Sequence, residues 1–310
     1  MAITVCPVTE GFAAEIGDVD LSRPLDPADA ASIKQAFWDY AVLVFPGQEL
    51  TDEQHIDFAR HFGPLETTIA VLNPDAKLRV PDKLADVSNL NSRSEIWGEK
   101  SRTRMLQLAN RLWHTDSSFK YLPARASLLY ARTVAPIGGH TEFADLRAAY
   151  DALDEELRRR LDGLVAEHAL AFSRARIGFS AFTEAERKSL PPVPQVIART
   201  IPENGRRSLY LASHAGRILG MREDEGRALI DQLIAHATQR QFVYHHRWRV
   251  HDLVMWDDRC TMHRGTDFDD LRWTRDVRRA TVSDVANTCE QQGIAVAPPA
   301  GDTSASAEEY

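Results

Sequence analysis

The first part of the chain alternates helical and extended patterns of apolar residues. Residues 26–40 carry apolar positions at helical spacing, and Asp26 has the side chain of a typical N-cap. The run AVLVF at 41–45 follows at once and predicts a short buried strand. The segment Thr51–Gln54 has the pattern of a capping box, which predicts a second helix that runs to Gly63. The chain is therefore expected to begin with a helix, a strand and a helix.

Most later segments have the residue types of β-strands. Runs rich in β-branched and aromatic residues predict strands at 126–135, 140–144, 195–213 (two strands joined by a turn at Asn204-Gly205), 241–248, 252–257 and 278–284. Helical spacing at 145–164 and 223–238 predicts two further helices. Because loops rather than regular helical crossovers separate these strands, we expect a mainly β fold of antiparallel sheets with flanking helices.

Two segments lack a regular pattern. Residues 64–112 mix charges with turn-forming residues, which is typical of a long loop or lid through which a substrate could enter. Residues 297–310 are mostly small, polar and acidic, and we expect a disordered tail there. Since no long linker rich in Pro, Gly or Ser precedes the tail, residues 1–296 are expected to form a single domain with 64–112 as an insertion.

Composition narrows the class of protein. Of the 310 residues, 44% are hydrophobic and 26% are charged, as in ordinary globular proteins with a sizeable core. The net charge of -8 argues against nucleic acid or an anionic membrane as a partner. The N-terminus lacks the pattern of a signal peptide, and no run of 18 uncharged apolar residues occurs, so we expect a cytoplasmic protein without a membrane span. Cys6, Cys260 and Cys289 have no C-x-x-C spacing and are expected to be reduced thiols.

The segment LWHTDSSF at 112–119 carries the first candidate chemistry. On a strand, His114 and Asp116 would point to the same face, because side chains alternate. An imidazole and a carboxylate suit Fe(II), and one distant histidine would complete a facial triad with open positions for a chelating substrate and O2. A zinc hydrolase could use the same ligands. Taken alone, however, an H-x-D triplet is more often a histidine beside a solvated aspartate.

His263 is the best candidate for the distant ligand. It follows an apolar strand pattern that begins at Met255, and it lies just before an expected turn. His245 and His246 are adjacent and would face opposite sides of a strand, so we expect packing or surface roles for them. His214 follows a predicted strand and could reach the pocket. Structural roles are expected for the remaining histidines, which are His55, His61, His140, His168, His236 and His251.

An arginine pair lies downstream of His263. Arg275 and Arg279 are four residues apart on the expected last strand and therefore share one face. A guanidinium can bind a carboxylate through two parallel hydrogen bonds, so this pair could clamp the acid groups of a co-substrate and a substrate. The alternative is a solvated basic edge strand.

Seven segments in the same order carry a family resemblance. They are AVLVFPGQ at 41–48, FARHFGPLE at 58–66, LWHTDSSF at 112–119, GGHTEFADLRAAYDAL at 138–153, HATQRQFVYHHRW at 236–248, DLVMWDDRCTMHRG at 252–265 and RRATV at 278–282. Together they resemble the taurine/2-oxoglutarate dioxygenase family, and within it most closely the bacterial 2,4-dichlorophenoxyacetate (aryloxyalkanoate) dioxygenases. The resemblance spans nearly the whole chain.

The resemblance implies a fold and a set of site residues. The implied fold is a double-stranded β-helix, or jelly roll, with flanking helices. Matched by position, the residues are Fe(II) ligands at His114, Asp116 and His263, 2-oxoglutarate contacts at Thr141 and Arg275, a substrate acid contact at Arg279, and residues near the substrate at Asn110, Ser117 and His214. The stretch between His263 and the arginine pair is one residue longer than the family pattern, and Arg275 is matched in preference to Arg272 by anchoring on RRAT.

The implied reaction consumes 2-oxoglutarate and O2 and yields succinate and CO2. The implied substrate is a small carboxylate, most closely an aryloxyacetate such as 2,4-dichlorophenoxyacetate, whose hydroxylation gives a phenol and glyoxylate. Taurine, another sulfonate or an N-substituted amino acid are alternative substrates for the same chemistry. Alternatives from other classes are a zinc hydrolase and a non-catalytic jelly roll. The resemblance also implies a homo-oligomer, either a dimer or a larger assembly.

Overall fold

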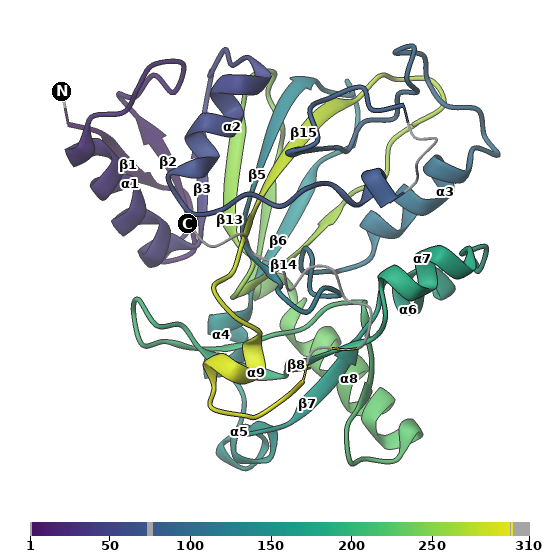
Figure 1. Ribbon diagram of the computed structural model, residues 1–310. Helices are drawn as coiled ribbons and strands as arrows, with labels where there is room; N and C mark the ends of the chain where they lie inside the picture. Colours follow the sequence, from purple (N-terminus) through teal and green to yellow (C-terminus); the bar gives the residue numbers. More distant parts are fainter. Residues whose placement is uncertain (1, 73–76, 298, 300–310) are drawn as a thin grey trace.

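The protein is built around one large, twisted β-sheet, seen in the computed structural model of Figure 1, which describes residues 2–72, 77–297 and 299. The sheet has the strand order β1-β2-β3-β13-β5-β15-β4. Its strands are β1 (Thr4–Pro7), β2 (Ala13–Gly17), β3 (Val42–Phe45), β4 (Leu84–Asp86), β5 (Ala124–Thr133), β13 (Leu253–Asp257) and β15 (Asp276–Ser283). Neighbouring strands are antiparallel except β2 and β3, which are parallel.

Three smaller sheets complete the β-structure. The first has the antiparallel order β12-β6-β14 and consists of β12 (Val243–His246), β6 (Thr141–Asp145) and β14 (Thr261–Gly265). The second has the order β11-β7-β8 and consists of β11 (Ala215–Ile218), β7 (Val165–His168) and β8 (Val193–Val196). The third is a hairpin of β9 (Ala198–Thr200) and β10 (Arg207–Leu209). This hairpin confirms the predicted pair of strands joined by a turn at Asn204-Gly205.

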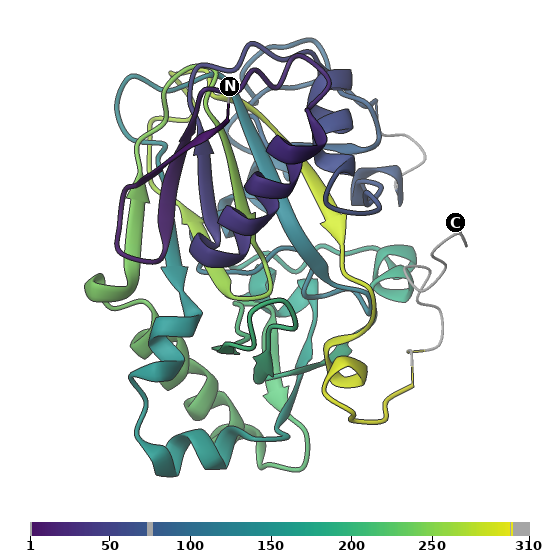
Figure 2. The same ribbon diagram turned by 90° about the vertical axis from the view of Figure 1, so that its left-hand side faces the viewer.

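Helices flank the sheets (Figures 1 and 2). The α-helices are α1 (Pro27–Tyr40), α2 (Asp52–Arg60), α3 (Arg102–Leu108), α4 (Leu146–Asp151), α5 (Glu155–Leu161), α6 (Leu170–Ala175), α7 (Glu184–Ser189), α8 (Glu223–Ala237) and α9 (Thr288–Gln291). The 3-10 helices are η1 (Ile69–Leu72), η2 (Ala109–Arg111) and η3 (Arg240–Phe242). Within the described ranges, no helix is long and apolar enough to cross a membrane.

Around the large sheet the core has two layers, because the strands of this sheet are buried on both faces. Leu43 of β3 and Met255 of β13 pack with apolar side chains of α1 and α2 on one face. Val44 and Trp256 point the other way and pack against Phe143 of the small sheet β12-β6-β14. Side-chain alternation therefore explains why these strands read as continuous hydrophobic runs. The functional side chains described below lie where these two sheets face each other.

The expected helix, strand and helix are confirmed, together with the helix caps, but the chain does not begin with them, because the unpredicted strands β1 and β2 come first. The Asp26 side chain accepts a hydrogen bond from the backbone N–H of Ala28 and begins α1. Thr51 and Gln54 form the reciprocal capping box that begins α2. The pattern at 223–238 is likewise a helix, α8. These elements were predictable because caps and helical spacing are local properties of the sequence.

The predicted helix at 145–164 is wrong in its extent. The chain forms two short helices, α4 and α5, and then enters β7 at Val165. Asp154 causes the break, because its side chain caps a new helix by accepting a hydrogen bond from Leu157 N. A capping residue inside an otherwise helical pattern offers the backbone an alternative to continuing the first helix.

The segment 64–112 has more regular structure than the expected loop. It contains η1, β4, α3 and η2, and β4 pairs with β15 through the register Arg279↔Ala85. β4 is only three residues long, which explains why its pattern was not recognised in the sequence. The expected disordered tail at 297–310 lies outside the described residues except for positions 297 and 299.

Candidate metal centre

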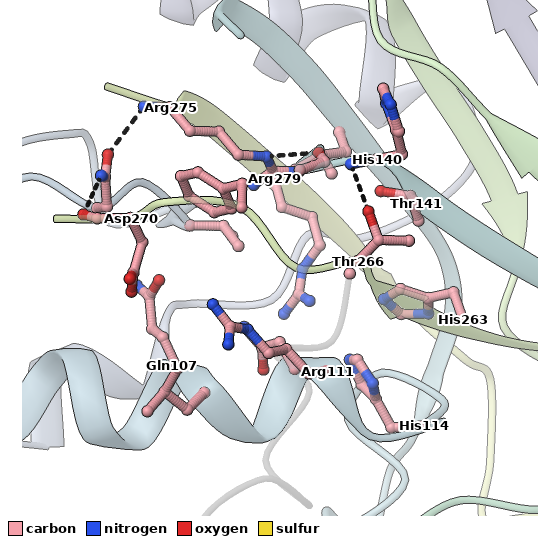
Figure 3. Close-up of a pocket in the computed structure, with 18 of the residues that line it drawn as sticks. Gln107, Arg111, His114, His140, Thr141, His263, Thr266, Asp270, Arg275 and Arg279 are labelled. Atoms are coloured by element: carbon pink, nitrogen blue, oxygen red, sulfur yellow. Dashed lines mark hydrogen bonds between the residues drawn. The ribbon is translucent and has the colours of Figure 1, made fainter. Parts of the chain in front are cut away.

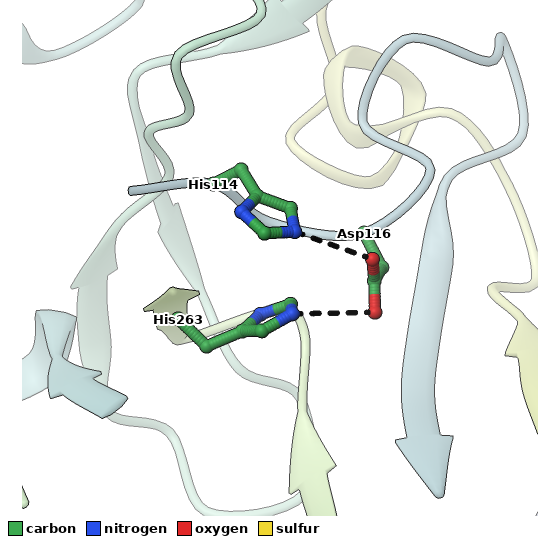
Figure 4. Close-up of side chains that lie close together, drawn as sticks. All are labelled: His114, Asp116 and His263. Carbon is green, nitrogen blue, oxygen red and sulfur yellow. Dashed lines mark ion pairs between the residues drawn. The ribbon is translucent and has the colours of Figure 1, made fainter. Parts of the chain in front are cut away.

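Three side chains that are remote in sequence converge at one point. His114, Asp116 and His263 are buried, and one ligand atom from each lies within 4.8 Å of the others. Figure 4 shows the two imidazoles aimed at the carboxylate, with Nε2 of His114 and of His263 each 3.8 Å from one Asp116 oxygen. Two imidazoles and one carboxylate are the donor set of a facial triad, which suits Fe(II) and leaves coordination positions open.

A backbone contact between two distant segments creates this convergence. His114 and His263 form an isolated antiparallel bridge, with His114 N–H donating to His263 O at 3.0 Å and His263 N–H donating to His114 O at 2.8 Å. Thr115 points away from the centre, where its Oγ1 lies 2.8 Å from Leu211 O and 2.9 Å from Thr261 O. Asp116 then returns to the side of His114. The predicted alternation is confirmed for these three residues.

The expected backbone context of the ligands is wrong in two respects. His114 and Asp116 lie on no regular strand, because pairing is limited to the single bridge at His114 and a turn begins at Asp116. His263 lies within β14, after a turn at 258–260, rather than just before a turn. The turn separates β13 from β14, so the apolar strand and the histidine belong to different sheets.

Electrostatics favour the protonation states that a divalent metal requires. Burial lowers the pKa of His114, and it lowers the pKa of His263 well below the usual range. Burial alone would raise the pKa of Asp116, but Arg279 and the two imidazoles outweigh it and the pKa is lowered. At neutral pH the histidines are therefore neutral and the aspartate is ionised, as metal ligands must be.

Neighbouring groups orient the ligands. The carbonyl of Leu112 lies 2.8 Å from His114 Nδ1 and accepts a hydrogen bond from it, which leaves Nε2 free to bind a metal. Ser127 donates to Asp116 Oδ2 at 2.8 Å, and Arg279 donates to Asp116 Oδ1. Asp258 accepts from the backbone N–H of Asp116 at 3.1 Å. Sequence reasoning did not identify Ser127 or Asp258, because neither has a recognisable spacing from the ligands.

Two of the candidate ligand residues open onto a cavity that also contains the predicted arginine pair (Figure 3). His114, His263, Thr141, Arg275 and Arg279 all line this cavity. Figure 3 shows the Arg275 and Arg279 side chains directed toward the side of the cavity where His263 lies. The sequence prediction that these residues come together is therefore confirmed as geometry, whereas their roles stay predictions.

Arg275 is a guanidinium without a carboxylate partner among the described residues. Its Nε donates to Gly139 O at 3.0 Å, and its backbone N–H donates to Asn89 Oδ1 at 2.8 Å. Burial lowers its pKa to about 10, so it remains a cation at neutral pH. Arg272 is exposed and stacks on the Trp273 ring at 4.5 Å, so it is Arg275 and not Arg272 that faces the cavity.

Thr141 presents its hydroxyl to the same cavity. Trp248 Nε1 donates to Thr141 Oγ1 at 3.0 Å, which leaves the hydroxyl proton of Thr141 available to a ligand. The unpaired cation and the free donor together form a site for an anionic group.

The three residues matched to the substrate region lie in two places. Asn110 lines the cavity. Ser117 does not line it and instead donates to Glu66 Oε2 at 2.7 Å. His214 is buried outside the cavity lining, where its Nδ1 contacts Ser173 Oγ at 2.9 Å and its ring lies 6.1 Å from that of His114. The structure thus brings all three close to ligand residues, but only Asn110 to the cavity.

His140 is a cavity residue that sequence reasoning missed. A structural role was expected, yet His140 lines the cavity and its backbone N–H donates to Thr266 Oγ1 at 2.9 Å. Gly138 and Gly139 precede it with φ of 72° and 67°, and a Cβ on Gly138 would lie 2.1 Å from Asp267 O. This glycine turn, which only glycine can form in such close contact, was the sequence feature that marked the position.

The segment 64–112 supplies one wall of the cavity. Arg104 and Gln107 of α3 line it, and Arg104 forms two hydrogen bonds, of 2.9 and 3.0 Å, with the carboxylate of Asp270, which also lines the cavity. Gln107 Nε2 donates to Asp86 O at 3.1 Å. None of the α3 residues is buried, so these polar contacts hold the helix in place.

Comparisons with known proteins agree with this geometry. Residues 4–281 match the family described as taurine catabolism dioxygenase TauD, TfdA family. The chain is 43% identical over 286 residues to the alpha-ketoglutarate-dependent 2,4-dichlorophenoxyacetate dioxygenase of Cupriavidus pinatubonensis (strain JMP 134 / LMG 1197), covering 92% of this chain and 99% of that protein. It is 38% identical to the (S)-phenoxypropionate/alpha-ketoglutarate-dioxygenase of Sphingobium herbicidovorans, covering 86% of this chain and 91% of that protein.

A solved structure is similar over the same length. The crystal structure of AAD-2 in complex with Mn(II) and N-oxalylglycine superimposes with a TM-score of 0.86 at 46% identity, covering 93% of this chain and 99% of that one. Both the sequence match and the structural match extend over nearly all of the described residues. The chain belongs to the taurine catabolism dioxygenase TauD, TfdA family.

Proposed function

We propose that the protein is an Fe(II)- and 2-oxoglutarate-dependent dioxygenase that hydroxylates an aryloxyacetate such as 2,4-dichlorophenoxyacetate. The observation that carries the proposal is the triad of His114, Asp116 and His263. Its two imidazoles share a cavity with the unpaired guanidinium of Arg275. A triad alone would also suit a zinc hydrolase, but hydrolysis has no use for an anion clamp at this place. The names of the relatives at 43% and 38% identity support the aryloxyalkanoate substrate class.

Each residue then has a role that its surroundings support. The triad holds Fe(II), which when bound supplies the activation of O2 that couples decarboxylation of 2-oxoglutarate to hydroxylation of the substrate. Arg275 and the Thr141 hydroxyl bind the far carboxylate of 2-oxoglutarate. Arg279 binds the acid group of the substrate. The apolar and aromatic cavity wall, with Leu129, Trp256 and Phe268, excludes bulk water from the reacting groups.

The products follow from the chemistry of the substrate. Hydroxylation of the carbon between the ether oxygen and the carboxylate gives a hemiacetal, which collapses to a phenol and glyoxylate. The co-substrate leaves as succinate and CO2. Asn110, Ser117 and His214 shape the surroundings of the substrate in this proposal, with Asn110 in direct contact with the cavity.

The proposal has an architectural part. We infer that the large sheet and the β12-β6-β14 sheet together form a double-stranded β-helix within a single domain of residues 1–296, and that 64–112 acts as a lid. The α3 wall of the cavity supports the lid role. A homo-oligomeric assembly and a cytoplasmic location, which the family resemblance implies, belong to the same proposal, and sedimentation analysis tests the assembly.

Substrate-dependent product formation tests the function. The purified protein is incubated with Fe(II), ascorbate and 2-oxoglutarate, and with phenoxyacetates, taurine or N-substituted amino acids in parallel. We expect phenol, glyoxylate and succinate in equal amounts from the phenoxyacetates. Succinate formation stimulated by taurine or an amino acid, without phenol from any phenoxyacetate, would move the proposal to the alternative substrates. Product formation with Zn(II) as the only added metal would reject the proposal that the protein is a dioxygenase.

A further inference from the structure

Arg174, near the end of α6, is a cation with no acidic partner in the described part of the chain. Its Nη1 donates to Ser173 Oγ at 3.0 Å, whereas its Nε is buried and has no hydrogen-bond partner. Burial and the charge of Arg279 lower the pKa of Arg174 to about 10, although the charge of Asp116 opposes them. The side chain is still positively charged at neutral pH. It has no role in the site as described so far.

Arg174 is half-buried, and the fully buried arginines of this protein show that a missing partner is unusual. Three guanidinium groups with almost no exposed surface each pair with a carboxylate, namely Arg147 with Asp145 at 2.9 Å, Arg199 with Asp284 at 3.2 Å and Arg259 with Asp257 at 2.7 Å. Burying a charge without a partner is costly, which explains this pattern. Arg275, which faces the cavity, and Arg174 have no ion pair with a described carboxylate.

The free edge of Arg174 has the geometry that binds a carboxylate. Because Ser173 takes Nη1, the remaining donors are Nε and Nη2, which lie along one edge of the guanidinium. The same edge holds a carboxylate through two parallel bonds in Arg79–Asp86, at 2.8 and 2.8 Å. A planar fork of this kind is specific for planar anions such as carboxylates.

Arg174 is coupled to the metal centre through a short chain of contacts. Ser173 Oγ also contacts His214 Nδ1 at 2.9 Å. The His214 ring packs edge-on against His114 at 6.1 Å and against Phe119 at 5.0 Å. Burial is the main cause of the lowered pKa of both His114 and His214. The charge of Arg174 contributes to the lowering in both histidines.

The position of Arg174 differs from that of the 2-oxoglutarate clamp. Neither Arg174 nor His214 lines the cavity that contains Thr141 and Arg275. The guanidinium therefore lies outside that cavity, on the side of the triad where the buried rings of His214 and Phe119 pack against each other at 5.0 Å. An aromatic wall next to an unpaired guanidinium matches the two parts of an aryloxy acid, which are a ring and a carboxylate.

We propose that the Nε and Nη2 edge of Arg174 binds the carboxylate of the aryloxy acid substrate and, together with Arg279, selects acids over neutral aryl ethers. This inference rests on the proposed function for its substrate class. Arg174 is thus a specificity-determining residue on the His214 side of the triad, and Ser173 is the positioning residue that orients its free edge.

Ligand binding without turnover tests this role. Protein loaded with Mn(II) and 2-oxoglutarate is titrated calorimetrically with phenoxyacetate and with its neutral analogue phenoxyacetamide. Arg174→Met should weaken phenoxyacetate binding by about tenfold or more, the typical loss for a charge-assisted hydrogen bond. Binding of phenoxyacetamide and of 2-oxoglutarate should stay unchanged. Arg174→Lys, which keeps the charge but lacks the fork, should fall between wild type and Arg174→Met.

Unfolding measurements separate this role from a structural one. Since Arg174 forms no ion pair with a described carboxylate, Arg174→Met should leave the free energy of unfolding unchanged or raise it, whereas Arg147→Met should lower it by leaving Asp145 unpaired. Arg176→Met, on an exposed residue paired with Asp231, is the control for binding. Phenoxyacetate affinity equal to wild type in Arg174→Met, or an equal loss of 2-oxoglutarate affinity, would overturn the inference.

Turnover measured in parallel distinguishes the two proposals. If wild type binds phenoxyacetate through Arg174 but releases no phenol, the inference stands and the proposed function fails. If phenol forms normally and Arg174→Met binds phenoxyacetate as well as wild type does, only the inference fails. If wild type binds no phenoxyacetate under these conditions, the inference is rejected as well.

Discussion

The guanidinium of Arg279 donates a hydrogen bond to the carboxylate of Asp116. This contact joins the arginine proposed for the substrate's acid group to a proposed metal ligand. Ser127 holds the other Asp116 oxygen at 2.8 Å, so both oxygens of the carboxylate have partners that fix its orientation. Arg279 is therefore expected to influence the metal centre as well as the substrate, and its substitution has to be compared with that of the ligands.

Removal of a metal ligand should abolish turnover and weaken metal binding. For His114→Ala or Asp116→Ala we expect metal affinity to fall by at least about 100-fold, since loss of groups that only orient ligands already costs roughly 10–100-fold. Calorimetric titration with Mn(II) measures the affinity. His245→Ala serves as the matched control, because His245 pairs with Glu142 outside the cavity lining. Wild-type affinity in both ligand variants would place the metal elsewhere.

Removal of Arg275, the proposed 2-oxoglutarate clamp, should weaken binding of the co-substrate. Arg275→Met leaves the far carboxylate without its cationic partner, so we expect the KM for 2-oxoglutarate to rise by about tenfold or more and the KM for phenoxyacetate to change little. Steady-state kinetics with each substrate varied in turn measure both values. Arg272→Met is the control, since Arg272 is exposed and stacks on Trp273.

Arg279→Ala should have the opposite kinetic pattern. Its main effect is expected on the KM for phenoxyacetate, by about tenfold or more, because a charge-assisted contact to the substrate is lost. A smaller loss of metal affinity should accompany it, since Asp116 loses one of its partners. If Arg279→Ala raised only the KM for 2-oxoglutarate while Arg275→Met raised that for phenoxyacetate, the two assignments would be reversed.

Local sequence features predicted α1, α2, α8 and their caps, because helical spacing and capping act over a few residues. The break at Asp154 was missed because a capping residue within a helical pattern is ambiguous until packing decides. The ligand triad was identified by residue type and family resemblance. Its geometry depends on a backbone bridge between residues 114 and 263, which no local pattern encodes.

Residues that act through tertiary contacts were the ones that sequence reasoning missed. His140 lies at the start of the predicted strand 140–144, but the strand pattern alone does not show that it faces the cavity; it directly follows the glycine turn. Arg174 looks like an ordinary surface arginine on a short helix. Only the absence of an acidic partner around its buried Nε, within the described ranges, distinguishes it. Unmet pairing of buried charges is a property of packing and cannot be read from spacing.

The hydroxyl of Thr115 should stabilise the segment that carries two ligands. Its Oγ1 lies within 2.9 Å of the carbonyls of Leu211 and Thr261, and all three residues are buried. Thr115→Val keeps the shape but leaves these carbonyls without the donor, so we expect the free energy of unfolding to fall by about 1–3 kcal/mol. Urea denaturation measures the change. An unchanged midpoint would mean that the hydroxyl does not anchor this segment.

Stability should decrease with acid because of buried neutral histidines, of which His168 is the clearest. Burial lowers the pKa of His168 to about 3, and neither ring nitrogen has a hydrogen-bond partner. In the unfolded chain its pKa is about 6.5, so between pH 6.5 and 3 the unfolded state binds a proton that the folded state does not. The free energy of unfolding therefore falls as the pH falls through this window.

His168→Phe removes the effect and should reduce the loss of stability between pH 7 and pH 5 by about 2 kcal/mol. Urea denaturation at the two pH values measures it, with His61→Phe as an exposed control. An identical pH dependence in wild type and His168→Phe would show that His168 takes up a proton while the protein remains folded.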